Sequence, residues 1–215
     1  MLKTILIGTI LVACASVAAA QDDYKKFEFF VGYSHNRIDT GISDDDPDLG
    51  DIIDEREGFN GVNVSATGNL SRYFGIKGDF SVHVKSRTFP FGSIAVPTAE
   101  VDVKSRVFNF LGGVQLKDNS TEGTFKPFAH ALVGVAHVRN RVDFNNDVCI
   151  AVFPSPCPTD FTDSETGFAG AFGGGLDIRA SDRISVRAIQ IDYNPTRVFD
   201  STQHNFRIGV GIVFH

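Results

Sequence analysis

The stretch that decides the fold runs Asn205-Phe206-Arg207-Ile208-Gly209-Val210-Gly211-Ile212-Val213-Phe214-His215. Apolar side chains fill every second position of it, namely Phe206, Ile208, Val210, Ile212 and Phe214. The positions between them hold Asn205, Arg207, Gly209 and Gly211. Because successive side chains of a strand point to opposite faces, this alternation predicts a β-strand with one apolar and one polar face.

The same two-residue period recurs upstream and is clearest in the segment 74–87. Ile76, Phe80, Val82 and Val84 share one face there, and the other face carries Lys77, Asp79, Ser81, His83 and Lys85. We expect eight strands, at 27–38, 59–69, 74–87, 101–117, 125–142, 167–179, 184–194 and 203–214. The alternation is poorer at 101–117 and 125–142, where the two faces stay unassigned. A slip near Ala188-Ile189 predicts a β-bulge.

The expected connections alternate in length. The long ones are 39–58, 88–100, 143–166 and 195–202, and the short ones lie near 70–73, 118–124 and 180–183. Long strands, aromatic residues near strand ends and this alternation indicate an all-β, eight-stranded antiparallel up-and-down transmembrane barrel, with short turns on the periplasmic side. A soluble β-sandwich has the same period and stays open as an alternative, with its apolar rows facing a core.

The first twenty residues have the pattern of a secretory signal peptide. Lys3 is followed by the apolar run 5–12, and Ala18-Ala19-Ala20 forms a small-residue cleavage site. We therefore expect a signal peptide over 1–20 and one domain over 21–215. The segment Leu11-Val12-Ala13-Cys14 leaves open a second interpretation, in which Cys14 is a lipidation site.

Charge and cysteine content narrow the function classes. The net charge of −6 argues against nucleic-acid binding, which favours a basic face. After removal of the leader, Cys149 and Cys157 are the two remaining cysteines. An even pair in an exported protein predicts a disulfide, which would staple a loop tip.

Taken together, the strand pattern, the row Phe206–Phe214 and the segment Arg187–Tyr193 resemble the small OmpA-type outer-membrane β-barrel family over nearly the whole mature chain. The resemblance implies location in the outer membrane of a diderm bacterium, contact with its lipid, and a monomer. It also implies that the alternate residues Phe206, Ile208, Val210, Ile212 and Phe214 are read by the barrel-assembly machinery. The peptidoglycan-binding domain of longer family members is missing from this sequence.

A barrel of this kind would place charged side chains inside, where they must be paired. The candidates for this polar network are Glu28, Lys77, Asp79, Lys85, Arg187 and Arg207, joined by His83, Asp177 and, if the bulge turns it inward, Asp192. A salt-bridged interior that plugs the barrel is the favoured interpretation. The alternative is a narrow, gated channel for small solutes.

Other functions have weaker support in the sequence. Asp44, Asp46, Asp48 and Glu55 have a calcium-loop spacing, but Leu49 replaces the required glycine. Neither a nucleophile elbow nor an HExxH motif accompanies the histidines. We therefore expect no enzyme activity, no catalytic residue, no metal site and no cofactor. The expected role is envelope integrity or surface interaction with an unknown extracellular ligand, and a secreted β-sandwich adhesin remains a further alternative.

Overall fold

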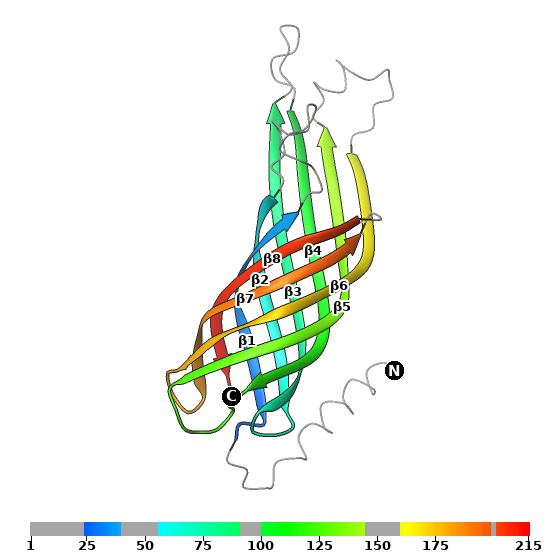
Figure 1. Cartoon of the computed structure of the whole chain (residues 1–215). Helices are drawn as coiled ribbons and strands as arrows, with labels where there is room; N and C mark the ends of the chain where they lie inside the picture. The colour runs from blue at the N-terminus through cyan, green and yellow to red at the C-terminus, as the bar shows by residue number, and fades with distance from the viewer. Residues whose placement is uncertain (1–23, 40–55, 91–99, 145–159, 199–200) are drawn as a thin grey trace, which may run out of the picture.

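The computed structural model describes residues 24–39, 56–90, 100–144, 160–198 and 201–215. Its strands are β1 (Phe27–Asp39), β2 (Arg56–Asn69), β3 (Phe74–Pro90), β4 (Glu100–Lys117), β5 (Phe125–Phe144), β6 (Asp160–Arg179), β7 (Ile184–Val198) and β8 (Ser201–Phe214). Each strand pairs antiparallel with the next, and β8 pairs back onto β1 (Figure 1). This confirms the eight-stranded up-and-down barrel. The expected signal peptide and the two cysteines of the expected disulfide lie outside the described residues.

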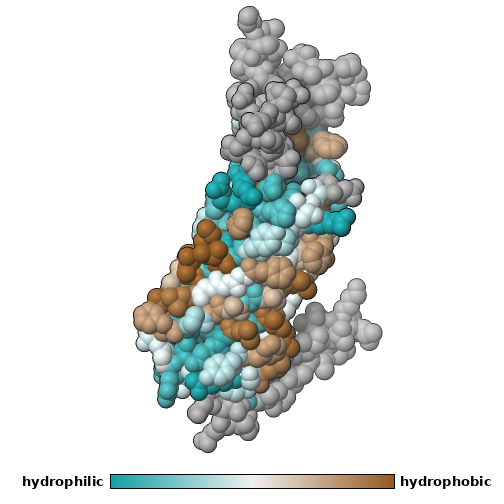
Figure 2. Space-filling view, viewed as in Figure 1, coloured by the Kyte–Doolittle hydropathy of each residue, from teal (hydrophilic) through white to brown (hydrophobic). Residues whose placement is uncertain are grey.

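The apolar rows face outward. Phe206, Ile208, Val210, Ile212 and Phe214 are each 41–45% exposed, and similar rows run along the other strands. On the face seen in Figure 2, hydrophobic residues gather over the middle and lower part of the barrel, and mostly hydrophilic residues lie above them. A soluble sandwich would bury these rows, so the sandwich alternatives are wrong.

Several strands extend further than the sequence pattern predicts. β6 begins at Asp160 instead of Gly167, and the expected long connection 195–202 is replaced by a tight hairpin, since β7 continues to Val198 and β8 begins at Ser201. Pro195 misled the prediction, because proline cannot donate a hydrogen bond to a ladder. It nevertheless lies within β7, opposite His204, close to the hairpin end.

The four consecutive strands β3 to β6 are longer than the other four. β3 to β6 have 17, 18, 20 and 20 residues, whereas β1, β2, β7 and β8 have 13, 14, 15 and 14. A tilted strand needs about 9–11 residues to cross a bilayer. The surplus of β3–β6 rises above the other strands on the side of the long connections (Figure 1). We call this wall the β3–β6 extension.

The predicted bulge is present in β7. The register of β7 against β8 shifts between Arg187 and Gln190, and the register of β6 against β7 shifts between Leu176 and Asp177. Ala188 and Ile189 consequently both face outward, while Arg187 and Gln190 are buried inside. Because of the bulge, the inward positions continue at Gln190 and Asp192, and Asp192 is buried inside the barrel.

An apolar patch inside the barrel accounts for the poor alternation of β4 and β5. Leu111, Leu132 and Ala136 form a buried cluster with Ala169 and Ala171 of β6. A period-two prediction depends on a difference in polarity between the two faces of a strand, and inward apolar residues reduce that difference.

Among the described residues, no helix has the length and hydropathy needed to cross a membrane.

Candidate functional site: the charged barrel interior

The lower half of the interior is organised around Lys117 of β4. Its Nζ donates to Glu28 Oε1 (2.5 Å) and to Asp177 Oδ2 (2.8 Å). Arg187 of β7 binds the same Asp177 through two contacts, Nε to Oδ1 at 2.8 Å and a terminal nitrogen to Oδ2 at 3.1 Å. Gln115 donates to the second oxygen of Glu28 at 3.1 Å. Four strands are therefore joined by one set of buried ion pairs.

The upper half is organised around Arg207 of β8. Its Nε and Nη2 donate to Asp192 Oδ2 at 2.9 and 2.7 Å, and its Nη1 donates to Asp79 Oδ1 at 2.8 Å. Asn63 donates to the other oxygen of Asp79 at 3.0 Å. His130 Nε2 lies 2.9 Å from Asp192 Oδ1, and its Nδ1 lies 3.3 Å from the ammonium of Lys77. Both carboxylates of this half are thus held by the same guanidinium.

Gln190 joins the two halves. It accepts a hydrogen bond from Arg187 Nη1 (2.7 Å) and donates one to Asp192 Oδ2 (2.7 Å). The joined network, which we call the interior network, contains four acids and four bases, all buried: Glu28, Asp79, Asp177, Asp192, Lys77, Lys117, Arg187 and Arg207. Equal numbers of opposite charges satisfy the requirement that buried ions be compensated.

Two aromatic rings close the lumen at the level of Arg187. The guanidinium carbon lies 4.3 Å from the centroid of the Phe30 ring and 4.1 Å from that of Phe128. Phe30 comes from β1 and Phe128 from β5, so that the stack connects three parts of the wall. Cation–π contact on two sides strengthens as water is excluded. The stack fills the narrow lumen that an eight-stranded barrel leaves.

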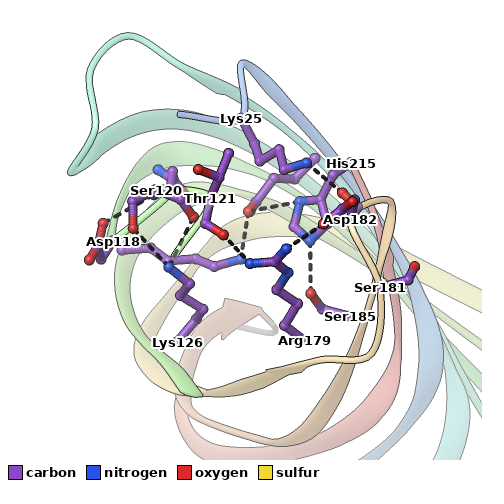
Figure 3. A pocket seen from close by; sticks show the side chains of 13 residues that line it. Lys25, Asp118, Ser120, Thr121, Lys126, Arg179, Ser181, Asp182, Ser185 and His215 are labelled. Atoms are coloured by element: carbon purple, nitrogen blue, oxygen red, sulfur yellow. Dashed lines mark hydrogen bonds and ion pairs between the residues drawn. The ribbon is translucent and has the colours of Figure 1, made fainter. Parts of the chain in front are cut away.

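Polar contacts close the short-turn end (Figure 3). Lys126 Nζ donates to the carbonyl oxygen of Ser120 at 3.0 Å, and Arg179 donates to the carbonyl oxygen of Thr121. Lys25 Nζ donates to the carbonyl oxygen of Asp182 at 2.5 Å. The cavity between these groups measures about 20 Å³, close to the space of a single water.

His215 lies in the same closure, beyond the end of β8. Its Nε2 is 2.9 Å from Ser185 Oγ, and its Nδ1 is 3.5 Å from Glu28 Oε1. Burial lowers the pKa of His215 below its ordinary value of 6.5, against the opposing effect of Glu28. The neutral imidazole is therefore the form that fits the closed end.

The opposite mouth carries a separate ion cluster. Lys85 Nζ lies 2.9 Å from Glu57 Oε2, and Arg87 pairs with the other oxygen of Glu57. The side chains of Lys85 and Arg87 are 20% and 28% exposed, in contrast to the 0–3% of the interior ion pairs. This cluster lines the mouth on the side of the long connections.

The structure brings together five of the six expected polar residues. Glu28, Lys77, Asp79, Arg187 and Arg207 belong to the interior network, and Lys85 lies apart from it, at the mouth. The row Phe206–Phe214 faces outward, and its role as an assembly signal stays a prediction. Within the described ranges, no three His, Cys, Asp or Glu side chains gather as metal ligands would. The spaced acids 44–55 lie outside those ranges.

Sequence reasoning missed Lys117, Gln115, His130 and Phe128, all of which face inward. They belong to β4 and β5, whose faces the sequence left unassigned. A signal was present at the end of β4, where Gln115 and Lys117 alternate with Val114 and Leu116. Reading that short stretch by itself would have placed two further network residues.

Comparison with solved structures finds the same fold. Ail, the attachment invasion locus protein of Yersinia pestis, in complex with the heparin analogue sucrose octasulfate, matches with a TM-score of 0.54 at 16% identity, over 87% of this chain and 97% of that one. Neisserial surface protein A matches with a TM-score of 0.51 at 10% identity, over 88% and 97%. Comparison with curated protein sequences finds no significant match.

The family comparison covers nearly the whole chain. The model of the outer membrane protein beta-barrel domain matches residues 7–214. This agrees with the closed barrel, its outward apolar rows and its charged interior. The chain belongs to the outer membrane protein β-barrel family.

Proposed function

We propose that this protein is a sealed barrel that supports the envelope structurally and presents its long-connection end to the cell surface. The single observation that carries the proposal is the filled lumen, in which Arg187 lies between Phe30 and Phe128 inside an electroneutral ion network. A channel needs a continuous water-filled path. The stack and the closed short-turn end favour the structural role over the narrow channel.

The surface role has its own support. The β3–β6 extension carries the wall beyond the length that a bilayer crossing needs, toward the side of the long connections. Two structures with the same fold are named as an attachment invasion locus protein and as a surface protein. We extend that surface role to this chain. The proposal includes export by the signal peptide 1–20 to the outer membrane of a diderm bacterium, as a monomer.

We propose no catalytic activity. His35, His137 and His204 lie toward the mouth, where each contacts a neutral partner: Asn60 (2.9 Å), Thr166 (2.8 Å) and Tyr193 (2.5 Å). A nucleophile–base pair needs a third group that orients the base. Among the described residues, no carboxylate contacts the imidazole ring of any of these three histidines. They support a role as polar residues of the membrane interface.

Planar-bilayer recording of the refolded full-length chain tests the sealed barrel. A shift in gel mobility on boiling first establishes that the sample is folded. We expect no discrete conductance steps from the wild type, and we expect leak from the double variant Arg187→Ala/Phe128→Ala, which opens the stack. Regular, steady steps from the wild type would support the channel instead.

The envelope and surface roles are tested in cells. Deletion should raise sensitivity to detergent and lower attachment to glycosaminoglycan-coated surfaces. Complementation with the wild-type gene should restore both. A deletion strain that matches its parent in detergent sensitivity and attachment would contradict both proposed roles.

A further inference from the structure

Four basic side chains form a compact group on the outside of the β3–β6 extension. Lys104 and Arg106 of β4 face outward, as do Arg139 and Arg141 of β5. Lys104 pairs with Arg141 across the two strands, and Arg106 pairs with Arg139 on the next rung of the same face. The four side chains line a hollow of about 160 Å³. We call this group the basic square.

The charges of the basic square are only half compensated by the protein. Asp143 accepts from Lys104 at 3.3 Å and from Arg141 at 2.7 Å. Within the described part of the chain, Arg106 and Arg139 have no carboxylate at ion-pair distance. Their ladder neighbours Val84 and Ser164 are uncharged. Like charges directly opposite each other in a ladder are unfavourable, so the lower pair of arginines is suited to an added anion.

The position of the basic square coincides with the edge of the lipid-facing belt. On β4 the outward positions between 108 and 116 hold Phe108, Phe110, Gly112, Val114 and Leu116, a span of 9 residues without an outward charge. A bilayer crossing takes about 9–11 strand residues. Arg106 is the next outward residue. The basic square therefore begins where acyl chains end and headgroups start.

We propose that the basic square binds the phosphate groups of an outer-leaflet lipid headgroup. A guanidinium group donates two parallel hydrogen bonds to the oxygens of one phosphate. Arg106 and Arg139 face each other, so they can donate to the same phosphate from both strands. Lys104 and Arg141, one rung further out, already pair with Asp143, and Arg141 also lies 3.6 Å from Asp160, so Arg106 and Arg139 carry the binding. The side-wall position favours a lipid over a soluble polyanion, because the lipid's own chains then pack on Phe108 and Phe110 below.

Binding of diphosphoryl lipid A to the refolded full chain in uncharged detergent micelles tests this proposal. We expect the double variant Arg106→Gln/Arg139→Gln to bind at least about tenfold more weakly than the wild type. Monophosphoryl lipid A should bind the wild type more weakly than the diphosphoryl form. The gel shift on boiling reports whether each variant folds, and both arginines are exposed.

A matched control removes the same charge elsewhere. Arg37 of β1 and Arg197 of β7 also face outward and are exposed. We expect Arg37→Gln/Arg197→Gln to change binding by less than about twofold. Equal weakening by both double variants would show general charge attraction and overturn the proposal, as would unchanged binding by Arg106→Gln/Arg139→Gln. Binding of sucrose octasulfate at the basic square, without binding of lipid A, would also overturn it and assign the site to a soluble sulfated glycan.

Discussion

Replacing Arg207 by methionine should destabilise the barrel more than any single change at its surface. Arg207 is 1% exposed and makes three short contacts with carboxylates, two with Asp192 and one with Asp79. Methionine keeps much of the side-chain volume but leaves both acids without their guanidinium. His130 then remains 2.9 Å from Asp192, and Asn63 remains 3.0 Å from Asp79.

The size of the effect follows from the burial of the pair. Removal of one partner from a buried ion pair costs about 3–5 kcal/mol, because the other charge stays uncompensated. A second substitution, Asp192→Asn, removes one of the two stranded charges. The double variant Arg207→Met/Asp192→Asn should therefore be more stable than Arg207→Met alone. The exposed Arg197→Met should change stability by less than about 0.5 kcal/mol.

Equilibrium urea unfolding of the protein in lipid vesicles measures all four proteins. The folded fraction is followed by the gel mobility of unboiled samples. A loss below about 1 kcal/mol for Arg207→Met would refute the reasoning, since the interior would then be hydrated enough to screen the acids. A double variant less stable than Arg207→Met would do so as well.

Four further variants extend the account. Gly134→Val should fail to assemble, because a Cβ at Gly134 would lie 2.0 Å from the carbonyl oxygen of Phe110. Gly78→Val should assemble, because a Cβ at Gly78 meets nothing within 4 Å. The gel shift on boiling distinguishes the two variants. Phe30→Ala removes a buried ring that stacks on Arg187 and should cost about 3–5 kcal/mol in urea unfolding, and a loss under about 1 kcal/mol would argue against the stack. Burial lowers the pKa of His215, so as the pH falls through 6.5 the unfolded chain takes up the proton before the folded chain does, and the free energy of unfolding decreases. His215→Gln should reduce this dependence of the unfolding free energy on pH, measured by urea unfolding. An unaltered dependence would assign the acid sensitivity to other groups.

The barrel and most of its inward residues could be predicted from the sequence because the period-two alternation indicates both the strands and the face on which each residue lies. Polar and apolar positions alternate strictly over 79–85 of β3, and apolar positions alternate with polar residues or glycine over 205–212 of β8; Lys77, Asp79 and Arg207 lie where the pattern put them. On β4 and β5 the interior contains apolar residues such as Leu111 and Leu132, which removed the contrast. Lys117, the centre of the lower half of the network, was lost for that reason.

The alternation pattern could not predict which charged side chains pair with each other. Arg207 and Asp79 are 128 positions apart in sequence, and their 2.8 Å contact crosses the lumen from β8 to β3. The alternation fixes the face of each residue, but the height of a side chain in the barrel depends on ladder register and on the bulge in β7. The length of β6 and the tight β7–β8 hairpin escaped prediction because Gly167 and Pro195 are residues that usually end strands.

The orientation of the apolar rows is the central claim, and tryptophan fluorescence tests it most directly. The chain contains no tryptophan, so Phe110→Trp places a single reporter at an outward position that is 52% exposed. After insertion into vesicles, we predict strong quenching by lipids brominated in their acyl chains and weak quenching by aqueous acrylamide. Fluorescence quenched by acrylamide, or by neither agent, would contradict a barrel whose apolar rows face lipid.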